Sequence, residues 1–484
     1  MLKDIIKGGS LILLSVVFSK LFSILYIPIL ARILGPNGFG LYNLALTMLP
    51  WFVNLISLSL STIVAQTIAE NSKNKERLSI IVTTYLFFTL LLSLFGGLLH
   101  LFFAKTIALE FFKSSELVHY LRLVSGGVAL AIFYNTIVGI ARGLKDFNLY
   151  FQMEVFKSFI YVVLGLLFLL FFRYGVQGAL LAIILSPIIP IVYLLIKHRQ
   201  YLGTTLRLNV IFSRLHTVLW VTLISLFLTF LVTADRFFLG IYADPEAIGF
   251  YASVMAVVMA ISLIASSFKG SILPFISEHF EHHEEIRLTV QRIVSYTLML
   301  TSFILFFFVT FRKEIILVLF GEEFLPALTI VPILGLTLIP FTIYILTHTI
   351  ILDRRMIAHA TKMLFPVTLV ALFVDWMLIK RFSVMGAGLG LFISHSLVAS
   401  TYLQILRTKF KLPLRRVLGL SLLIIVGVGL ALLLPSSLFY RIPLSFLLLL
   451  VYLGILWGFK FITKREVDIT IRIVKLYLRR LKSL

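Results

Sequence analysis

The chain has 484 residues, of which 60% are hydrophobic and only 13% are charged, and its formal net charge is +22. Soluble chains are about half apolar and about a quarter charged, so this composition excludes a large soluble protein. The chain has no cysteine, which excludes disulfides, thiolate nucleophiles and cysteine-ligated metals, and we expect no cofactor.

Apolar runs of about 20 residues recur along the chain, and each is long enough to cross a hydrocarbon core of about 30 Å. The N-terminal run has no small-residue cleavage site, so we interpret it as a retained membrane helix. We therefore predict an all-α integral membrane protein. Its fourteen transmembrane helices are expected near residues 9–34, 41–66, 79–104, 117–141, 150–172, 175–196, 216–242, 248–275, 291–311, 326–350, 363–379, 384–406, 417–434 and 442–462.

The positive residues indicate the orientation of these helices. With the N-terminus in the cytoplasm, 29 of the 43 Lys and Arg residues fall on inner segments or the C-terminal tail, and 9 fall on outer segments. This bias follows the positive-inside rule. We therefore expect a protein of the cell membrane with both termini in the cytoplasm, and no nucleic-acid partner. No connection is long enough to fold as a catalytic domain, so we do not expect an enzyme.

The chain contains an internal repeat. GPNGFGLY at 35–42 matches DPEAIGFY at 244–251, 209 residues later, and RYGVQGA at 173–179 matches RFSVMGA at 381–387, 208 residues later. Two matches at nearly one offset predict two six-helix lobes in parallel orientation, related by an axis along the membrane normal. The expected boundaries are 1–210 and 211–412 for the lobes, 413–463 for two added helices, and 464–484 for a cytoplasmic amphipathic tail. The glycine-rich stretch lacks the Lys-Ser/Thr of a phosphate-binding loop, and we interpret it as a turn.

Charged residues inside the predicted helices need an explanation, because each costs about 2.5–3.5 kcal/mol at the centre of a membrane helix. The cations are Lys20, Arg122, Lys157, Arg236 and Lys269, and the acids are Glu154, Asp235 and Asp375. If the cations face one water-filled cavity, its positive potential attracts an anion. The alternatives are structural ion pairs, for which Glu154 and Lys157 have helical spacing, and snorkelling, for which Arg122 lies near a helix end.

One histidine cluster resembles a metal site only superficially. EHFEHHEE at 278–285 places His279 and His283 at helical spacing with carboxylates nearby. The cluster lacks the HExxH order of zinc-dependent hydrolases and lies in a predicted cytoplasmic connection. We therefore expect no metal site there.

Three segments carry a family resemblance. SKLFSILYIPILARILGPNGFGLY at 19–42, RGLKDF at 142–147, and Asp235 followed by GFYA at 249–252 resemble the oligosaccharide flippases of the multidrug/oligosaccharidyl-lipid/polysaccharide (MOP) exporter superfamily. The resemblance implies a V-shaped pair of lobes around a central cavity lined by helices one, two, seven and eight. It would bring Lys20, Asp235, Arg236 and Lys269 toward that cavity. It also implies transport of polyprenyl-diphosphate-linked sugars to the outer leaflet.

Differences from the sequence patterns of lipid II flippases and multidrug antiporters favour the oligosaccharide flippases. Lipid II flippases carry an arginine–acid pair where this chain has Tyr26 and Ile27, and multidrug antiporters often carry an acid in helix one, whereas residues 9–34 contain none. The resulting hypothesis is a monomeric flippase for lipid-linked oligosaccharide that works by alternating access among membrane lipids. The proposed substrate-binding cations are Lys20, Lys269, Arg236, Lys157 and Arg122. Sodium or proton coupling through Asp235, Asp375 or Glu154 is left open. The alternatives are a lipid II flippase, a multidrug cation antiporter, and a membrane-embedded glycan polymerase or ligase.

Overall fold

The computed structural model describes residues 2–71, 74–267, 272, 283–351, 357–412, 414–458 and 461, and this part of the chain contains helices and no strands. Twelve helical stretches within it are long and apolar enough to cross a membrane. The predicted all-α membrane fold is therefore confirmed, whereas the count of fourteen crossings stays a prediction. The predicted C-terminal amphipathic tail and His279 lie outside the described residues.

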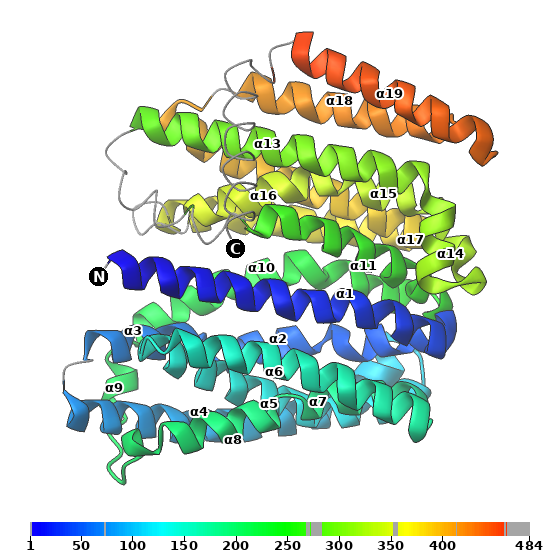
Figure 1. Cartoon of the computed structure of the whole chain (residues 1–484). Coiled ribbons are helices and arrows are strands. Elements are labelled where there is room, and N and C mark those ends of the chain that lie inside the picture. Colours follow the sequence, from blue (N-terminus) through cyan, green and yellow to red (C-terminus); the bar gives the residue numbers. More distant parts are fainter. Residues whose placement is uncertain are drawn as a thin grey trace, which may run out of the picture.

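The first half of the chain forms one group of helices (Figure 1). These are α1 (Leu2–Thr47), α2 (Leu49–Ile56), α3 (Leu60–Glu70), α4 (Lys75–Thr106), α5 (Glu116–Gly143), α6 (Phe147–Leu166), α7 (Gly175–Leu185), α8 (Ile188–Lys197), η3 (Arg199–Tyr201) and α9 (Asn209–Phe212). Single π-helical turns, η1 (Ile107–Phe111) and η2 (Leu167–Phe171), extend α4 and α6.

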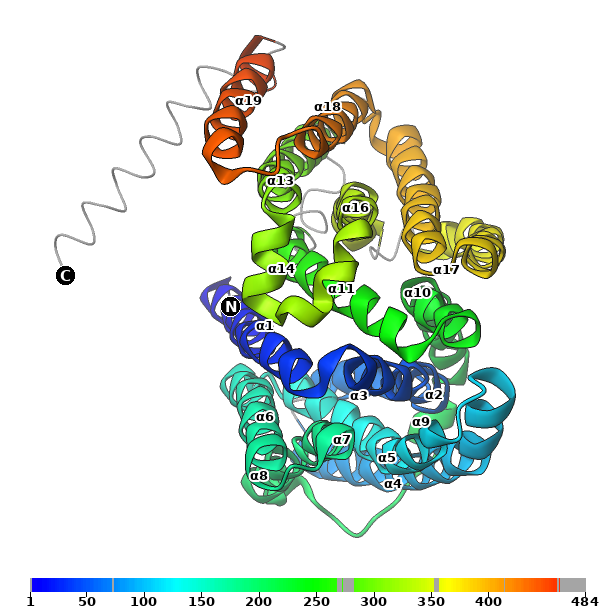
Figure 2. The same cartoon turned by 90° about the vertical axis from the view of Figure 1, so that its right-hand side faces the viewer.

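The second half contains the remaining described helices. These are α10 (Leu215–Tyr242), α11 (Pro245–Ser267), α13 (His283–Thr310), α14 (Arg312–Phe320), η4 (Glu322–Thr329), α15 (Val331–Leu336), α16 (Leu338–Ile351), α17 (Ile357–Phe410), α18 (Leu414–Leu432) and α19 (Leu438–Gly458). Viewed along the helices, α4 to α8 gather on one side and α13 to α19 on the other, with α1, α2, α10 and α11 between them (Figure 2). The predicted lobe boundaries agree with this arrangement but stay a prediction.

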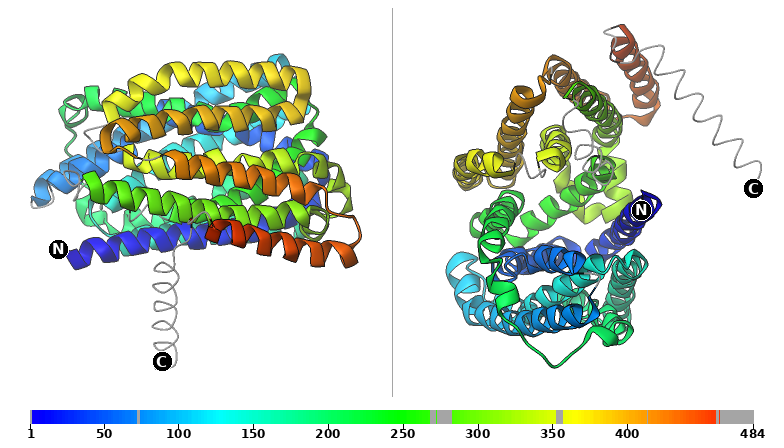
Figure 3. Two further views of the ribbon diagram at one scale, coloured as in Figure 1. Left: turned by 90° about the horizontal axis from the view of Figure 1, so that it is seen from above. Right: turned by 90° about the vertical axis from the view of Figure 1, so that its left-hand side faces the viewer.

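Two of the membrane-spanning stretches are about twice as long as a single crossing needs, which is about 20 residues. They are Leu14–Ile56, with 43 residues, and His359–Phe410, with 52 residues. Each contains one non-helical residue, Gly35 with φ 66° and Ser383 with φ 50°. The chain turns back at both places, as the two long arms of α17 show in Figure 3. Both turns coincide with the connections that the sequence predicts, and the glycine adopts its positive φ without steric cost.

The two halves meet in a reciprocal contact at the end of the bundle opposite the N-terminus. A side-chain carbon on Gly40 would lie 1.7 Å from the carbonyl oxygen of Pro245, and one on Gly249 would lie 2.0 Å from the carbonyl oxygen of Pro36. Only glycine permits such a close backbone approach. These four residues are the equivalent positions of the repeat, so the repeated turns pack against each other.

Arg32 reinforces the same contact. Its Nε donates a hydrogen bond to the carbonyl oxygen of Leu319 at 2.9 Å, and its Nη2 donates to the carbonyls of Leu317, at 3.0 Å, and Val318. These carbonyls belong to the last turn of α14, where a helix leaves its C=O groups unpaired. A cation also complements the negative end of the helix dipole. Arg32 of the first half therefore caps a helix of the second half.

Asp146 in the RGLKDF segment begins the helix that carries Lys157 and Tyr161. Its carboxylate accepts a hydrogen bond from the backbone N–H of Leu149 at 3.0 Å and lies 2.9 Å from the Lys197 ammonium. Burial alone would raise the pKa of Asp146, but the hydrogen bonds from Lys197 and Leu149 hold it below its ordinary value. The charged carboxylate is the form that caps the positive end of α6.

Candidate substrate cavity

A cavity of about 520 Å³ lies where the two halves meet. Its wall consists of side chains from α1, α6, α7, α10, α11 and α14. The polar members are Lys20, Ser23, Tyr42, Asn43, Tyr161 and Arg236, and most of the others are apolar. The volume falls within the range of about 300–1,000 Å³ that is typical of small-molecule sites. The cavity is therefore large enough to hold a charged headgroup.

Lys20 and Arg236 are the two cations on the cavity wall. Lys20 is exposed and Arg236 is partly buried, and within the described residues neither side chain has a hydrogen bond or an ion pair. Lys20 precedes the turn at Gly35 by about 15 residues and Arg236 precedes the end of α10 by about 6, so at about 1.5 Å per residue they lie about 13 Å apart along the bundle. The structure thus brings two predicted site residues to one cavity at different depths.

Lys157 is paired and is not part of the cavity wall. Its Nζ lies 3.3 Å from Glu154 Oε2 and 4.4 Å from the centre of the Tyr134 ring. The Tyr134 hydroxyl donates to the other carboxylate oxygen, Glu154 Oε1, at 2.9 Å. The ion pair of Glu154 and Lys157, which the sequence offered as the alternative to a substrate site, is therefore present, and the role of Lys157 in substrate binding stays a prediction. Their charges offset each other, although Lys157 is close enough to act electrostatically on Lys20.

Arg122 and Lys269 do not contribute to the described cavity. Arg122 is exposed on α5 and is not among the cavity-lining residues, so its expected place in the cavity is corrected. Its position near the start of α5 fits the snorkelling alternative. Lys269 lies outside the described residues, and its expected position stays a prediction.

The two buried acids form a separate polar cluster in the second half. The Tyr251 hydroxyl donates to Asp235 Oδ2, and the Ser394 hydroxyl donates to Asp375 Oδ1 at 2.9 Å. Both carboxylates are about 1% exposed, and their remaining oxygens have no hydrogen-bond partner within the described part of the chain. His395, adjacent to Ser394, bonds the Leu391 carbonyl at 2.9 Å through Nδ1. The unpartnered carboxylate oxygens of Asp235 and Asp375 are therefore available to bind a cation or a proton.

Asp235 corrects one expectation from the family resemblance. It does not line the cavity, whereas its neighbour Arg236 does. Successive helical residues point about 100° apart, so the rotation of α10 that turns Arg236 into the cavity turns Asp235 into the second half. Sequence reasoning also missed Tyr42, Asn43 and Tyr161 on the wall. The only signal for them was the place of Tyr42 in the repeated turn motif.

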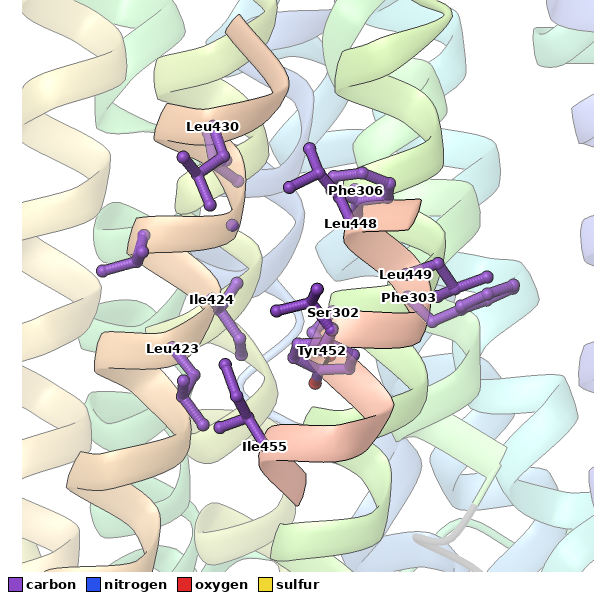
Figure 4. A pocket seen from close by; sticks show the side chains of 14 residues that line it. Ser302, Phe303, Phe306, Leu423, Ile424, Leu430, Leu448, Leu449, Tyr452 and Ile455 are labelled. Carbon is purple, nitrogen blue, oxygen red and sulfur yellow. Dashed lines mark hydrogen bonds between the residues drawn. The ribbon is translucent and has the colours of Figure 1, made fainter. Parts of the chain in front are cut away.

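A small apolar groove of about 70 Å³ lies between α13, α18 and α19, away from the cavity (Figure 4). Leucine, isoleucine, valine and phenylalanine side chains from the three helices line it. The one polar contact is a hydrogen bond between the Ser302 and Tyr452 hydroxyls, which joins α13 to α19. The groove therefore suits an apolar chain.

Comparison with known proteins agrees with this arrangement. A family described as polysaccharide biosynthesis protein matches residues 29–329. A protein of Shigella flexneri with the name "Putative O-antigen transporter" is 21% identical over 333 residues, which cover 66% of this chain and 78% of that protein.

Solved structures with low sequence identity share the fold. The lipid II flippase MurJ, in an inward closed conformation, has a TM-score of 0.71 and 14% identity, and the match covers 93% of this chain and 99% of that chain. An inward-facing multidrug resistance MATE transporter of the MOP superfamily has a TM-score of 0.70 and 16% identity, with 83% and 95% covered. A MOP superfamily transporter from Pyrococcus furiosus, reported for the reverse polarity of its binding pocket, has a TM-score of 0.59 and 17% identity, with 84% and 96% covered.

The described residues share the fold of transporters of the MOP superfamily, and their twelve long apolar helical stretches indicate a multi-pass membrane protein. Because the family match covers more than half of the chain, the chain belongs to the polysaccharide biosynthesis protein family, and it is similar to the putative O-antigen transporter of Shigella flexneri. The family membership predicted from the sequence is therefore confirmed.

Proposed function

We propose that the protein moves polyprenyl-diphosphate-linked oligosaccharides from the cytoplasmic to the outer leaflet of the cell membrane during surface polysaccharide assembly. It works as a monomer by alternating access, with both termini in the cytoplasm and without covalent change to the cargo. Membership of the polysaccharide biosynthesis family supports this class of cargo.

The observation that carries the proposal is the presence of Lys20 and Arg236, without carboxylate partners in the described residues, on the wall of one cavity. Two uncompensated cations in a cleft with low-dielectric walls create a positive potential that attracts an anion. A diphosphate supplies the matching charge, and charge-assisted hydrogen bonds are about twice as strong as neutral ones. The same potential repels cationic drugs, which disfavours the multidrug antiporter.

Because Lys20 and Arg236 lie at different depths along the bundle, the transported lipid contacts them one after the other. The diphosphate meets Lys20 first and Arg236 nearer the exit, with Lys269 as a further proposed contact on the inner side. An inside-negative membrane potential contributes about 2.3 kcal/mol per charge per 100 mV. That field drives the anionic headgroup outward and favours return of the empty cationic cavity.

The prenyl tail remains in the lipid during this movement, along the added helices. The apolar groove between α13, α18 and α19 (Figure 4) supports this path. Sodium or proton coupling would use Asp235 or Asp375, whose unpartnered oxygens support it. If coupling occurs there, an imposed sodium or proton gradient accelerates transport by the wild type, and Asp375→Asn removes that acceleration without removing basal transport.

The central test measures the movement of a fluorescent lipid-linked oligosaccharide in proteoliposomes. We expect the double variant Lys20→Ala/Arg236→Ala to lose at least about 100-fold in rate, because each lost charge-assisted bond costs about 1.5–3 kcal/mol. Arg122→Ala is the matched control, since it removes one positive charge outside the cavity. Wild-type rates in the double variant would eliminate the cavity assignment. Covalently altered product would instead indicate a polymerase or ligase.

A further inference from the structure

The cavity has two unlike walls. On the α11 side it presents alanines and methionines between Ala252 and Ala260, spaced at three and four residues along one helix face. On the side of α1 and α6 it presents Tyr42, Asn43 and Tyr161. Any neutral polar group of the cargo must therefore find its hydrogen bonds mainly on the second wall.

This polar wall has unused hydrogen-bonding capacity. The amide nitrogen of Asn43 donates to the Phe39 carbonyl at 2.8 Å, which leaves the amide oxygen and the second N–H of Asn43 available. The hydroxyls of Tyr42 and Tyr161 lie 2.8 Å apart and share one hydrogen bond. Because each hydroxyl carries one hydrogen and two lone pairs, the pair retains one donor and several acceptor positions for a ligand.

The polar wall is also held in place by its neighbours. The Tyr26 ring packs edge-on against the Tyr161 ring, with centroids 4.8 Å apart and an interplanar angle of 80°. The Phe39 ring stacks against Tyr42 at 6.3 Å, and Tyr42 is only 6% exposed. Side chains fixed before binding lose little conformational entropy when a ligand arrives, so these groups are prepared to select among ligands.

Their level in the bundle relates them to the predicted diphosphate position. Asn43 follows the turn at Gly35 by about 8 residues and Lys20 precedes it by about 15, so at about 1.5 Å per residue Asn43 lies about 10 Å further along the bundle than Lys20. A sugar that leads a diphosphate held at Lys20 would project to the level of Asn43 and the tyrosine pair.

We infer that Asn43 and the Tyr42–Tyr161 hydroxyl pair contact the sugar residue attached directly to the diphosphate and select it. This inference rests on the proposed function. The sugar's hydroxyl groups bond the amide and the tyrosine hydroxyls, while the alanines and methionines of α11 cover its apolar face. Methionine side chains adapt to different shapes, so the α11 wall can contact sugars whose apolar faces differ in shape. A wall built to bond specific hydroxyls rejects sugars that lack them.

The experiment compares two synthetic lipids on the full chain in nanodiscs. One is a polyprenyl diphosphate with a single N-acetylhexosamine, and the other is the same polyprenyl diphosphate without sugar; each competes against a fluorescent polyprenyl diphosphate. The wild type is expected to bind the glycosylated lipid more tightly. Asn43→Ala and Tyr161→Phe each lower this preference by about 2- to 10-fold, the value of one net hydrogen bond. Affinity for the sugar-free lipid stays within about twofold, because the cations that hold the diphosphate are unchanged.

One control separates selection from general damage. Tyr26→Phe removes a hydroxyl beside the wall that does not line the cavity, so this variant should preserve the preference. Equal binding of both lipids by the wild type, or an equal loss for both lipids in Asn43→Ala, would overturn the inference. A separate measurement tests the proposed function itself. If Lys20→Ala binds the sugar-free lipid as tightly as the wild type does, Lys20 does not hold the diphosphate and the proposed function fails.

Discussion

Equivalent positions of the two halves carry different chemistry. Tyr26 and Tyr42 of the first half correspond, at an offset of 209 residues, to Asp235 and Tyr251 of the second. In the first half the two tyrosines surround Tyr161 beside the cavity. In the second half the tyrosine hydroxyl donates to the buried aspartate. The repeat therefore preserves the arrangement of the helices, whereas these two positions are tyrosines beside the cavity in the first half and include a buried aspartate in the second.

The backbone contact between the halves has remained symmetric. Pro36 approaches Gly249 as Pro245 approaches Gly40, and both approaches leave no room for a side chain. Side chains could diverge because each half buries its own set, but the two turns pack against each other and constrain both copies at once. The comparison predicts equal effects at the glycines and unequal effects at the tyrosines.

The largest effect is expected at the glycine pair. Gly40→Ala and Gly249→Ala should each destabilise the protein by about 3 kcal/mol or more, because a rigid backbone carbonyl must move to admit the new carbon. Thermal unfolding of the purified protein in detergent measures this. Gly126→Ala is the control, since nothing lies within 4 Å of its added carbon. A well-tolerated substitution at one glycine alone would refute the reciprocal contact.

An intermediate and unequal effect is expected at the tyrosines. Tyr251→Phe leaves a buried carboxylate without its hydrogen bond, which costs about 1–3 kcal/mol or more. Tyr42→Phe should cost about 1 kcal/mol or less, because Tyr161 lines the cavity and a water there can replace the lost hydrogen bond. The same unfolding assay compares the two variants. Equal losses of unfolding free energy in Tyr251→Phe and Tyr42→Phe would contradict the proposed difference between the two halves.

The smallest effect concerns the second pair of repeated turns. Gly175 has φ 55°, and its counterpart Ser383 has φ 50° with ψ −126°, a sparsely populated backbone conformation that costs a non-glycine residue about 1 kcal/mol or more. Ser383→Gly should therefore stabilise by up to about 1 kcal/mol, and Gly175→Ser should destabilise by a similar amount. Shifts of opposite sign in the melting temperature are the expected result; shifts of the same sign would contradict the shared turn geometry.

The sequence by itself determined the all-helical membrane class, the turns at 35 and 383 and the repeat, and it offered the ion pair of Glu154 with Lys157 as an alternative to a substrate site. These depend on local quantities, namely apolar run length, turn residues and spacing along one helix. Tertiary structure alone decided which charges share a cavity. Arg236 faces it and Asp235 does not, because the rotation of α10 is set by packing against α2 and α17. The Tyr42–Tyr161 pair joins residues 119 positions apart, and no local pattern encodes a contact that only helix packing creates.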